Sequence, residues 1–240
     1  LSELGTYELA LRLSNLNRLF VDNVTRAWSP YFLNNIKNNE IGITKNYFKI
    51  ISFLSIFYMS FIFLSEEIII LLTTPAFYVA MYFMPLIIYK MFFSISSSLI
   101  YTQQITYSEK TKFTIPITIV EISFNLILNL ILIPLYGAYG AVIALLISAI
   151  CSSILGFILG QKVCRIKLQY SKIYFIYTFL FLTMITQLYL IELDLIFIYK
   201  VFIKISIIII YSIFLYTLKY IVYDDFKFLI YQFLNYYKKT

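Results

Sequence analysis

The segment from Thr114 to Gly160 reads TIPITIVEISFNLILNLILIPLYGAYGAVIALLISAICSSILGFILG and contains two long apolar runs around a short turn with Pro and Gly. Each run, 114–133 and 138–160, is close to the roughly 20 residues that an α-helix needs to cross a bilayer core. The segment therefore predicts two successive transmembrane helices joined by a tight turn.

The same pattern continues over most of the 240 residues, and the composition agrees with it. Hydrophobic residues make up 61% of the chain, charged residues only 13%, and the mean hydropathy is +0.85. Water-soluble domains carry roughly 25% charged residues. We therefore expect an all-α, polytopic membrane helix bundle of about seven transmembrane helices. The predicted helices are 7–32, 47–64, 79–103, 114–133, 138–160, 173–191 and 195–218, followed by an amphipathic tail, 219–240.

The positive charge of the chain indicates membrane orientation rather than a nucleic-acid partner. The formal net charge is +7, but the basic residues lie in breaks between apolar runs and not on a segment that could fold around a nucleic acid. Thirteen Lys and Arg residues lie in alternate breaks and in the tail, whereas the opposite breaks are almost free of them. Basic loops stay in the cytoplasm, which predicts a multi-pass protein of the cytoplasmic membrane with a cytoplasmic C-terminus.

The first residues lack an initiator Met, a basic stretch and a cleavage site of small residues, so we expect no secretory signal here. With seven spans and a cytoplasmic C-terminus, residue 1 falls on the far side of the membrane. Preceding helices in a larger protein would explain this most simply, so we expect an N-terminally incomplete protein.

Charged residues within the first predicted helix form one face. At 100° per residue, the following side chains share an arc of less than half the circumference: Arg12, Asn15, Arg18, Asp22 and Arg26. A charged side chain at the centre of a span costs at least about 2.5 to 3.5 kcal/mol, so this face predicts a polar, substrate-binding cavity. Alternatively, Asp22 pairs with Arg18 and Arg26, and the helix lies at the interface.

The helix 79–103 carries a second polar face with Lys90, Ser94 and Ser97 at helical spacing. Lys90 is about eleven residues into the span, where a Lys side chain reaches the interface poorly, although snorkelling is the alternative. We expect these three residues to line the same cavity.

The helix 114–133 has a third polar face, with Glu121 and Asn125. Because burial and charged partners set the pKa of a carboxyl group, Glu121 is a candidate for coupling to H⁺ or Na⁺. It could equally form a structural ion pair with Lys90 or Arg18. Small residues at every fourth position of 138–160 indicate close helix packing.

Catalytic and metal-binding patterns are not found in the sequence. The chain has no His, and Cys151 and Cys164 are predicted to be unpaired thiols. We expect no metal, no cofactor, no catalytic residues and no enzymatic activity. The helices 173–191 and 195–218 are apolar around most of their circumference, so we expect them to be peripheral and to face lipid.

Two stretches resemble polysaccharide-unit flippases of the Wzx type, which belong to the multidrug/oligosaccharidyl-lipid/polysaccharide exporter superfamily. They are Gly5-Thr6-Tyr7-Glu8-Leu9-Ala10 ahead of the polar helix, with Pro30 at its far end, and Ile133-Pro134-Leu135-Tyr136-Gly137-Ala138-Tyr139-Gly140-Ala141-Val142. The resemblance extends from about residue 5 to residue 160 and corresponds to the C-terminal portion of such proteins. Residues 1–160 would then form C-terminal-lobe helices, 161–218 two additional peripheral helices and 219–240 a cytoplasmic tail.

The resemblance implies an activity in O-antigen or capsule biosynthesis at the bacterial inner membrane. Such flippases expose a cationic cavity to each side of the membrane in turn and translocate an oligosaccharide repeat unit linked to polyprenyl diphosphate. The expected partners are this lipid-linked oligosaccharide, membrane lipids, H⁺ or Na⁺, and a missing N-terminal half.

Three other classes fit the sequence less well. An exporter of drugs or organic cations predicts an acidic cavity, whereas the cavity candidates here are mainly basic. A membrane-embedded oligosaccharide polymerase or glycosyltransferase needs a large catalytic loop, and the longest loop here has about fourteen residues. A receptor-like seven-helix protein leaves the Arg-rich face unexplained.

Overall fold

The computed structural model describes residues 3–193 and 196–217, apart from the side chains of residues 19 and 20, and within these ranges every regular element is helical. The predicted tail, 219–240, lies outside the described residues. The α-helices, in chain order, are α1 Glu3–Ser14, α2 Arg18–Asn35, α3 Glu40–Phe63, α4 Ser65–Leu72, α5 Ala80–Tyr107, α6 Thr114–Val163, α7 Tyr170–Glu192 and α8 Phe197–Thr217. Short 3₁₀ turns are η1 Asn15–Asn17, η2 Pro75–Phe77 and η3 Thr111–Phe113.

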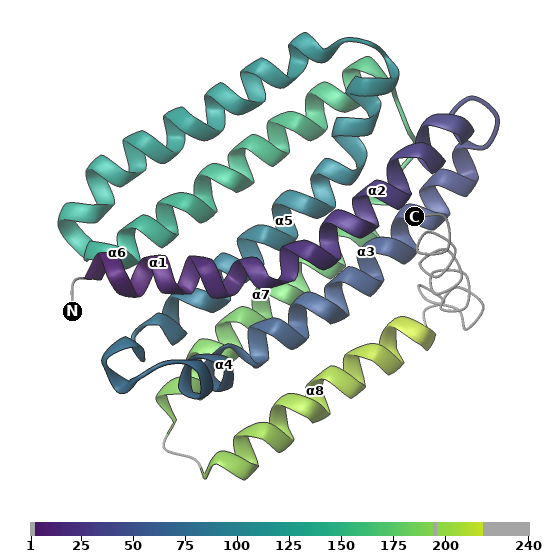
Figure 1. Ribbon diagram of the computed structural model, residues 1–240. Helices are drawn as coiled ribbons and strands as arrows, with labels where there is room; N and C mark the ends of the chain where they lie inside the picture. The colour runs from purple at the N-terminus through teal and green to yellow at the C-terminus, as the bar shows by residue number, and fades with distance from the viewer. Residues whose placement is uncertain (1–2, 194–195, 218–240) are drawn as a thin grey trace.

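Five of the described helices are long and apolar enough to cross a membrane: α3, α5, α6 together with η3, α7 and α8. This confirms a polytopic helical membrane bundle. The longest of them, α6, is a hairpin because Gly137 adopts φ 57° and ψ −138° and reverses the chain (Figure 1). Its arms, 114–136 and 138–163, run side by side and are joined by a hydrogen bond of 3.4 Å from Asn125 Nδ2 to Ser148 Oγ.

The first polar helix differs from the single span predicted over 7–32. The structure has α1 and α2 with the 3₁₀ turn η1 between them, and α1–α2 is not among the five apolar spans. Ser14, Asn15 and Asn17 lie at the break. The side chains of Ser14 and Asn17 do not bond to the local backbone: within the described residues the Ser14 hydroxyl has no partner, and Asn17 contacts Met91 and Tyr58.

Long α5 forms the centre of the bundle, and the helices around it alternate in direction. The helix α2 runs parallel to α5, and Trp28 on its inner side donates a hydrogen bond of 2.6 Å to the carbonyl of Leu99. On the other side, the hydroxyl of Tyr47 in α3 donates to the carbonyl of Ser96 at 2.9 Å, and Tyr177 of α7 stacks on Phe93. The second arm of α6 also packs against α5, and Gly156 accommodates the Tyr101 ring.

Because the helices alternate in direction, the loops that connect them lie at two opposite ends of the bundle. At one end, Thr44 bonds to the Lys167 carbonyl and Gln104 to the Cys164 carbonyl. Basic residues described near this end are Lys37, Lys45, Lys49, Lys110, Lys112, Lys162, Arg165, Lys167 and Lys172. At the other end, Glu3 contacts Ala138 and Ser65 contacts Gln187. The breaks predicted to be cytoplasmic therefore lie together, at the basic end.

Large apolar side chains cover the outer surface, as expected of helices that face lipid. On the first arm of α6 they point outward at most positions; examples are Ile119, Ile122 and Leu130, which are more than half exposed. The helix α8 is similar, with Phe202 70% exposed. The helix α7, for which the sequence predicts the same peripheral position, also packs against α3 and α5 through Ile176, Leu180 and Met184.

Candidate functional site

The charged face of α1–α2 lies open on the surface of the bundle. Its opposite face is fixed because Ala10, Val21 and Trp28 are buried. Every candidate residue of this face is exposed: Arg12, Asn15, Arg18, Asp22 and Arg26. The predicted face is therefore present, but the described residues do not enclose it in a cavity.

Acidic neighbours compensate part of this charge. Arg12 donates to Glu8 at 2.6 Å, and Arg18 lies 3.9 Å from Asp22, with all four side chains at least half exposed. Exposed pairs of this kind contribute about 0 to 1 kcal/mol and exchange partners easily. Arg26 forms no ion pair within the described part of the chain. The face thus carries three cations and two weakly held carboxylates.

Lys90 lies beside the joint between α1 and α2. It is the eleventh residue of α5, about 15 Å along the helix, and the next residue, Met91, receives a weak contact of 3.7 Å from the amide of Asn17. The residue as a whole is half-buried, and within residues 3–193 and 196–217 it has no acidic partner. An unpaired cation at this depth has an unmet demand for an anion.

The two serines predicted with Lys90 behave differently from it. Ser97 is 5% exposed, and its hydroxyl donates back to the carbonyls of Phe93 and Ser94 at 2.9 and 3.0 Å. Its hydrogen-bonding capacity is thus used within α5. Ser94 is half-buried and contributes its carbonyl to this bond. Lys90 and the Ser94 hydroxyl, which has no hydrogen bond within the described residues, are consequently the candidates on α5 that remain available to a ligand.

The third polar face, on the first arm of α6, is directed toward the second arm and α5. Asn125 bonds to Ser148 and accepts a hydrogen bond of 3.0 Å from Asn129. Glu121 is half-buried, and among the described residues it pairs with neither Lys90 nor Arg18. The structure therefore places Lys90 level with the joint between α1 and α2, and uses Asn125 to join the α6 arms.

A buried ion cluster, which sequence reasoning did not single out, joins α4 to α8 at the opposite end from the basic loops. Lys204 Nζ contacts Glu66 at 3.0 Å and Glu67 at 2.7 Å, and Lys200 Nζ contacts the other oxygen of Glu66 at 3.1 Å. The side chains are 3 to 17% exposed. We call these four residues the α4–α8 ion cluster.

The α4–α8 ion cluster is neutral as a unit, which explains how it can be buried. Both carboxylates lie in the first turn of α4, where the helix dipole favours negative charge. Lys200 also donates to the carbonyl of Ile191 at the end of α7, at 3.4 Å. The sequence did contain a signal: two Lys residues spaced by four in an otherwise apolar helix need acidic partners.

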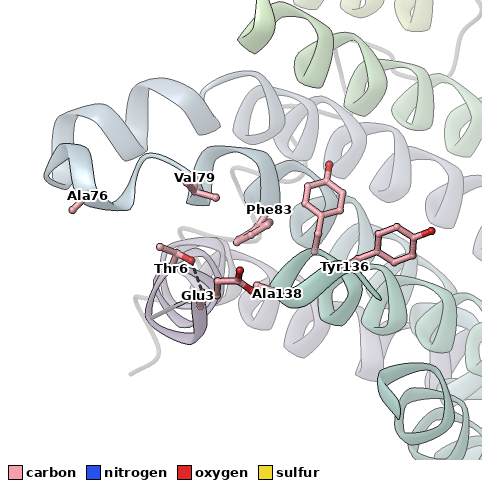
Figure 2. A pocket seen from close by; sticks show the side chains of 8 residues that line it. Glu3, Thr6, Ala76, Val79, Phe83, Tyr136 and Ala138 are labelled. Carbon is pink, nitrogen blue, oxygen red and sulfur yellow. Dashed lines mark hydrogen bonds between the residues drawn. The ribbon is translucent and has the colours of Figure 1, made fainter. Parts of the chain in front are cut away.

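A shallow hollow of about 350 Å³ lies at the same end of the bundle, between α1, the start of α5 and the α6 turn (Figure 2). Glu3 Oε2 accepts a hydrogen bond of 3.1 Å from the backbone N–H of Ala138, the first residue of the second α6 arm. A side chain on Gly137 would overlap this carboxylate. The lining is otherwise mainly apolar, with Val79, Phe83 and Tyr139.

The described residues include no group of three or more His, Cys, Asp or Glu side chains placed to hold a metal ion. Cys151 and Cys164 are free thiols. Burial, and to a smaller extent the charge of Glu40, raises the pKa of Cys164 above its usual range. A raised pKa disfavours the thiolate, which is the form of Cys that reacts and binds metals.

Comparison of the chain with protein-family models, with curated proteins and with solved structures finds no match.

Proposed function

We propose that this chain supplies one wall of a transport cavity that moves a polyprenyl-diphosphate-linked oligosaccharide repeat unit across the bacterial cytoplasmic membrane. Translocation proceeds by alternating access and involves no chemical step. A second helical lobe, in the same or another polypeptide, faces α1–α2 and completes the cavity. The basic end of the bundle lies in the cytoplasm, in agreement with the positive-inside rule.

Lys90 is the observation that carries this proposal. It is a half-buried cation well inside a spanning helix, without an acidic partner in the described part of the chain. A diphosphate would supply the missing anion through charge-assisted hydrogen bonds. The neighbouring face adds Arg18 and Arg26, whose guanidinium groups are exposed and can bind phosphate oxygens in a bidentate manner.

The distribution of acidic residues favours an anionic substrate over an organic cation. On the α1–α2 face, Glu8 and Asp22 already have Arg partners. Glu66 and Glu67 are neutralised by buried lysines. Among the described residues Glu121 is a half-buried carboxylate without an ion pair, but it lies on α6, whereas Lys90 and the α1–α2 face offer several basic groups to an anion.

Binding of polyprenyl diphosphate to the purified protein in detergent tests the proposal. Loss of one hydrogen bond to a charged group costs about 1.5 to 3 kcal/mol, so Lys90→Gln should weaken binding about tenfold or more, while Lys90→Arg should retain most of it. Lys110→Gln is the matched control, because this Lys is exposed at the cytoplasmic end. Equal affinities for the diphosphate and for the uncharged polyprenol would contradict the proposal.

A further inference from the structure

The connection between α6 and α7, residues 164–169, is fixed to the basic end of the bundle, where it crosses from the second arm of α6 to α7 (Figure 1). Its backbone takes part in four hydrogen bonds with side chains of α3, α5 and α6. They join Cys164 O to Gln104 at 2.7 Å, Ile166 N to Gln161 at 2.9 Å, Lys167 N to Glu40 at 2.7 Å and Lys167 O to Thr44 at 3.2 Å. These bonds hold the connection in a defined position.

The side chains of this connection alternate between the bundle and the surface. Ile166 and Leu168 are buried, whereas Arg165 and Lys167 are exposed. This is the pattern of an extended segment, in which residues two apart point to the same side. Lys162, in the last turn of α6, is exposed as well. The fixed backbone therefore presents three cations at the surface, and we call Lys162, Arg165 and Lys167 the α6–α7 basic surface.

The charge of the α6–α7 basic surface is not compensated within the described part of the chain. Its three cations form no ion pair there. Glu40 is the carboxylate that contacts the connection, but it is half-buried and accepts from the Lys167 backbone N–H rather than from a basic side chain. The exposed Lys45 follows Thr44 on α3 and adds a fourth positive charge nearby. This surface is therefore suited to an anion.

Apolar side chains on the outside of α6 lead directly to these cations. Ile154 and Ile158 are more than half exposed, and they precede Lys162 at intervals of four residues. Residues four apart lie on the same face of a helix. One outer face of α6 therefore changes from apolar side chains to a cation at the basic end.

The beginning of α7 has the composition of a membrane interface. Tyr170 and Tyr174 are spaced by four residues, and Tyr174 is 66% exposed. Tyr is enriched where lipid meets water, because its ring is apolar and its hydroxyl is polar. Tyr170 also packs edge-on against Phe157 of α6, with 5.8 Å between the ring centroids. The outer surfaces of α6 and α7 thus meet beside the connection, at the level of the lipid headgroups.

We propose that the α6–α7 basic surface binds the headgroup of an anionic phospholipid. Lys162, Arg165 and Lys167 contact its phosphate oxygens, and the planar guanidinium of Arg165 binds two of them at once. The acyl chains lie along the apolar outer faces of α6 and α7. A lipid fits this surface better than a soluble anion does, because the cations adjoin side chains that face the membrane interior. The site does not involve Lys90 or the α1–α2 face, so it is independent of the transport substrate.

Fluorescence quenching by brominated lipids in vesicles tests this proposal on the full chain. Tyr174→Trp places a reporter beside the site, while Trp28 is buried and gives a constant background. Brominated phosphatidylglycerol should quench the reporter at lower mole fractions than brominated phosphatidylcholine. Each basic residue near an anionic membrane surface contributes about fivefold. Lys162→Gln/Arg165→Gln/Lys167→Gln should therefore lower the preference for phosphatidylglycerol about fivefold or more.

A matched variant separates a defined site from the general positive charge of this end. Lys37→Gln/Lys110→Gln/Lys112→Gln removes the same charge from exposed positions in other connections, and should change the preference at the reporter by less than twofold. Exchanging Lys and Arg at the three positions of the site should preserve the preference. If the triple variant of the site does not fold, Arg165→Gln alone decides, with an expected loss of about fivefold. Equal quenching by the two lipids in the unaltered site, or equal losses in both triple variants, would overturn the proposal.

Discussion

Lys204 is the residue whose loss should affect the folded protein most, because it holds two buried carboxylates. Its Nζ lies 3.0 Å from Glu66 and 2.7 Å from Glu67, and its side chain is 3% exposed. In Lys204→Met, Glu66 keeps Lys200, but Glu67 loses its ion-pair partner among the described residues, and its other oxygen is already buried without a hydrogen bond. The variant therefore buries an uncompensated charge.

Removing one member of a buried ion pair costs about 3 to 5 kcal/mol, and we expect Lys204→Met to lower the free energy of unfolding by this amount. Reversible unfolding in mixed detergent micelles measures it. The double variant Lys204→Met/Glu67→Gln should recover most of the lost stability, because no buried charge is then left unpaired. Lys112→Met is the matched control, since this Lys is exposed in a connection. A loss below about 1 kcal/mol, typical of an exposed pair, would refute the reasoning.

Three further predictions concern other parts of the bundle. Gly137→Ala places a side chain at φ 57° and should destabilise the α6 hairpin by about 1 to 3 kcal/mol in the same unfolding assay, whereas an unchanged stability would mean that the turn differs from the one described. Trp28→Phe removes the 2.6 Å bond to Leu99 and should cost about 1 to 3 kcal/mol; a loss within error would show that α2 is held by other contacts. Ser97→Ala should change the affinity for polyprenyl diphosphate by less than twofold, because the Ser97 hydroxyl donates to a carbonyl within α5. A tenfold loss of affinity would show that Ser97 belongs to the binding site.

The spans α3, α5, α7, α8 and the two arms of α6 could be predicted from the sequence, because each depends only on the local length of an apolar run, whereas the predicted span 7–32 is not among the apolar spans of the structure. The α6 hairpin could be predicted for the same reason, since Pro134 and Gly137 interrupt one such run. The break at Asn15–Asn17 was missed: a helical wheel shows a continuous face and cannot show that the backbone hydrogen bonds change within it. The structure retains the charged face but divides it between two helices.

The α4–α8 ion cluster could not be derived from local pattern. Glu66 and Lys200 are 134 residues apart, and their pairing depends on how α8 packs against the corner between α3 and α4. Lys90 is the opposite case. Its depth in α5 follows from counting residues, but the absence of an acidic partner in the described chain could be established only once Glu121 was placed elsewhere.

The central claim, that the face of α1–α2 beside Lys90 receives the diphosphate group, is tested most directly by photocrosslinking. A polyprenyl diphosphate with a photoreactive group next to its phosphates is bound to the full-length protein, and the labelled residues are mapped by mass spectrometry. We predict labels on α1, α2 and the part of α5 around Lys90, reduced in Lys90→Gln. Labels distributed equally over the lipid-facing first arm of α6 and α8, and unaffected by Lys90→Gln, would contradict the claim.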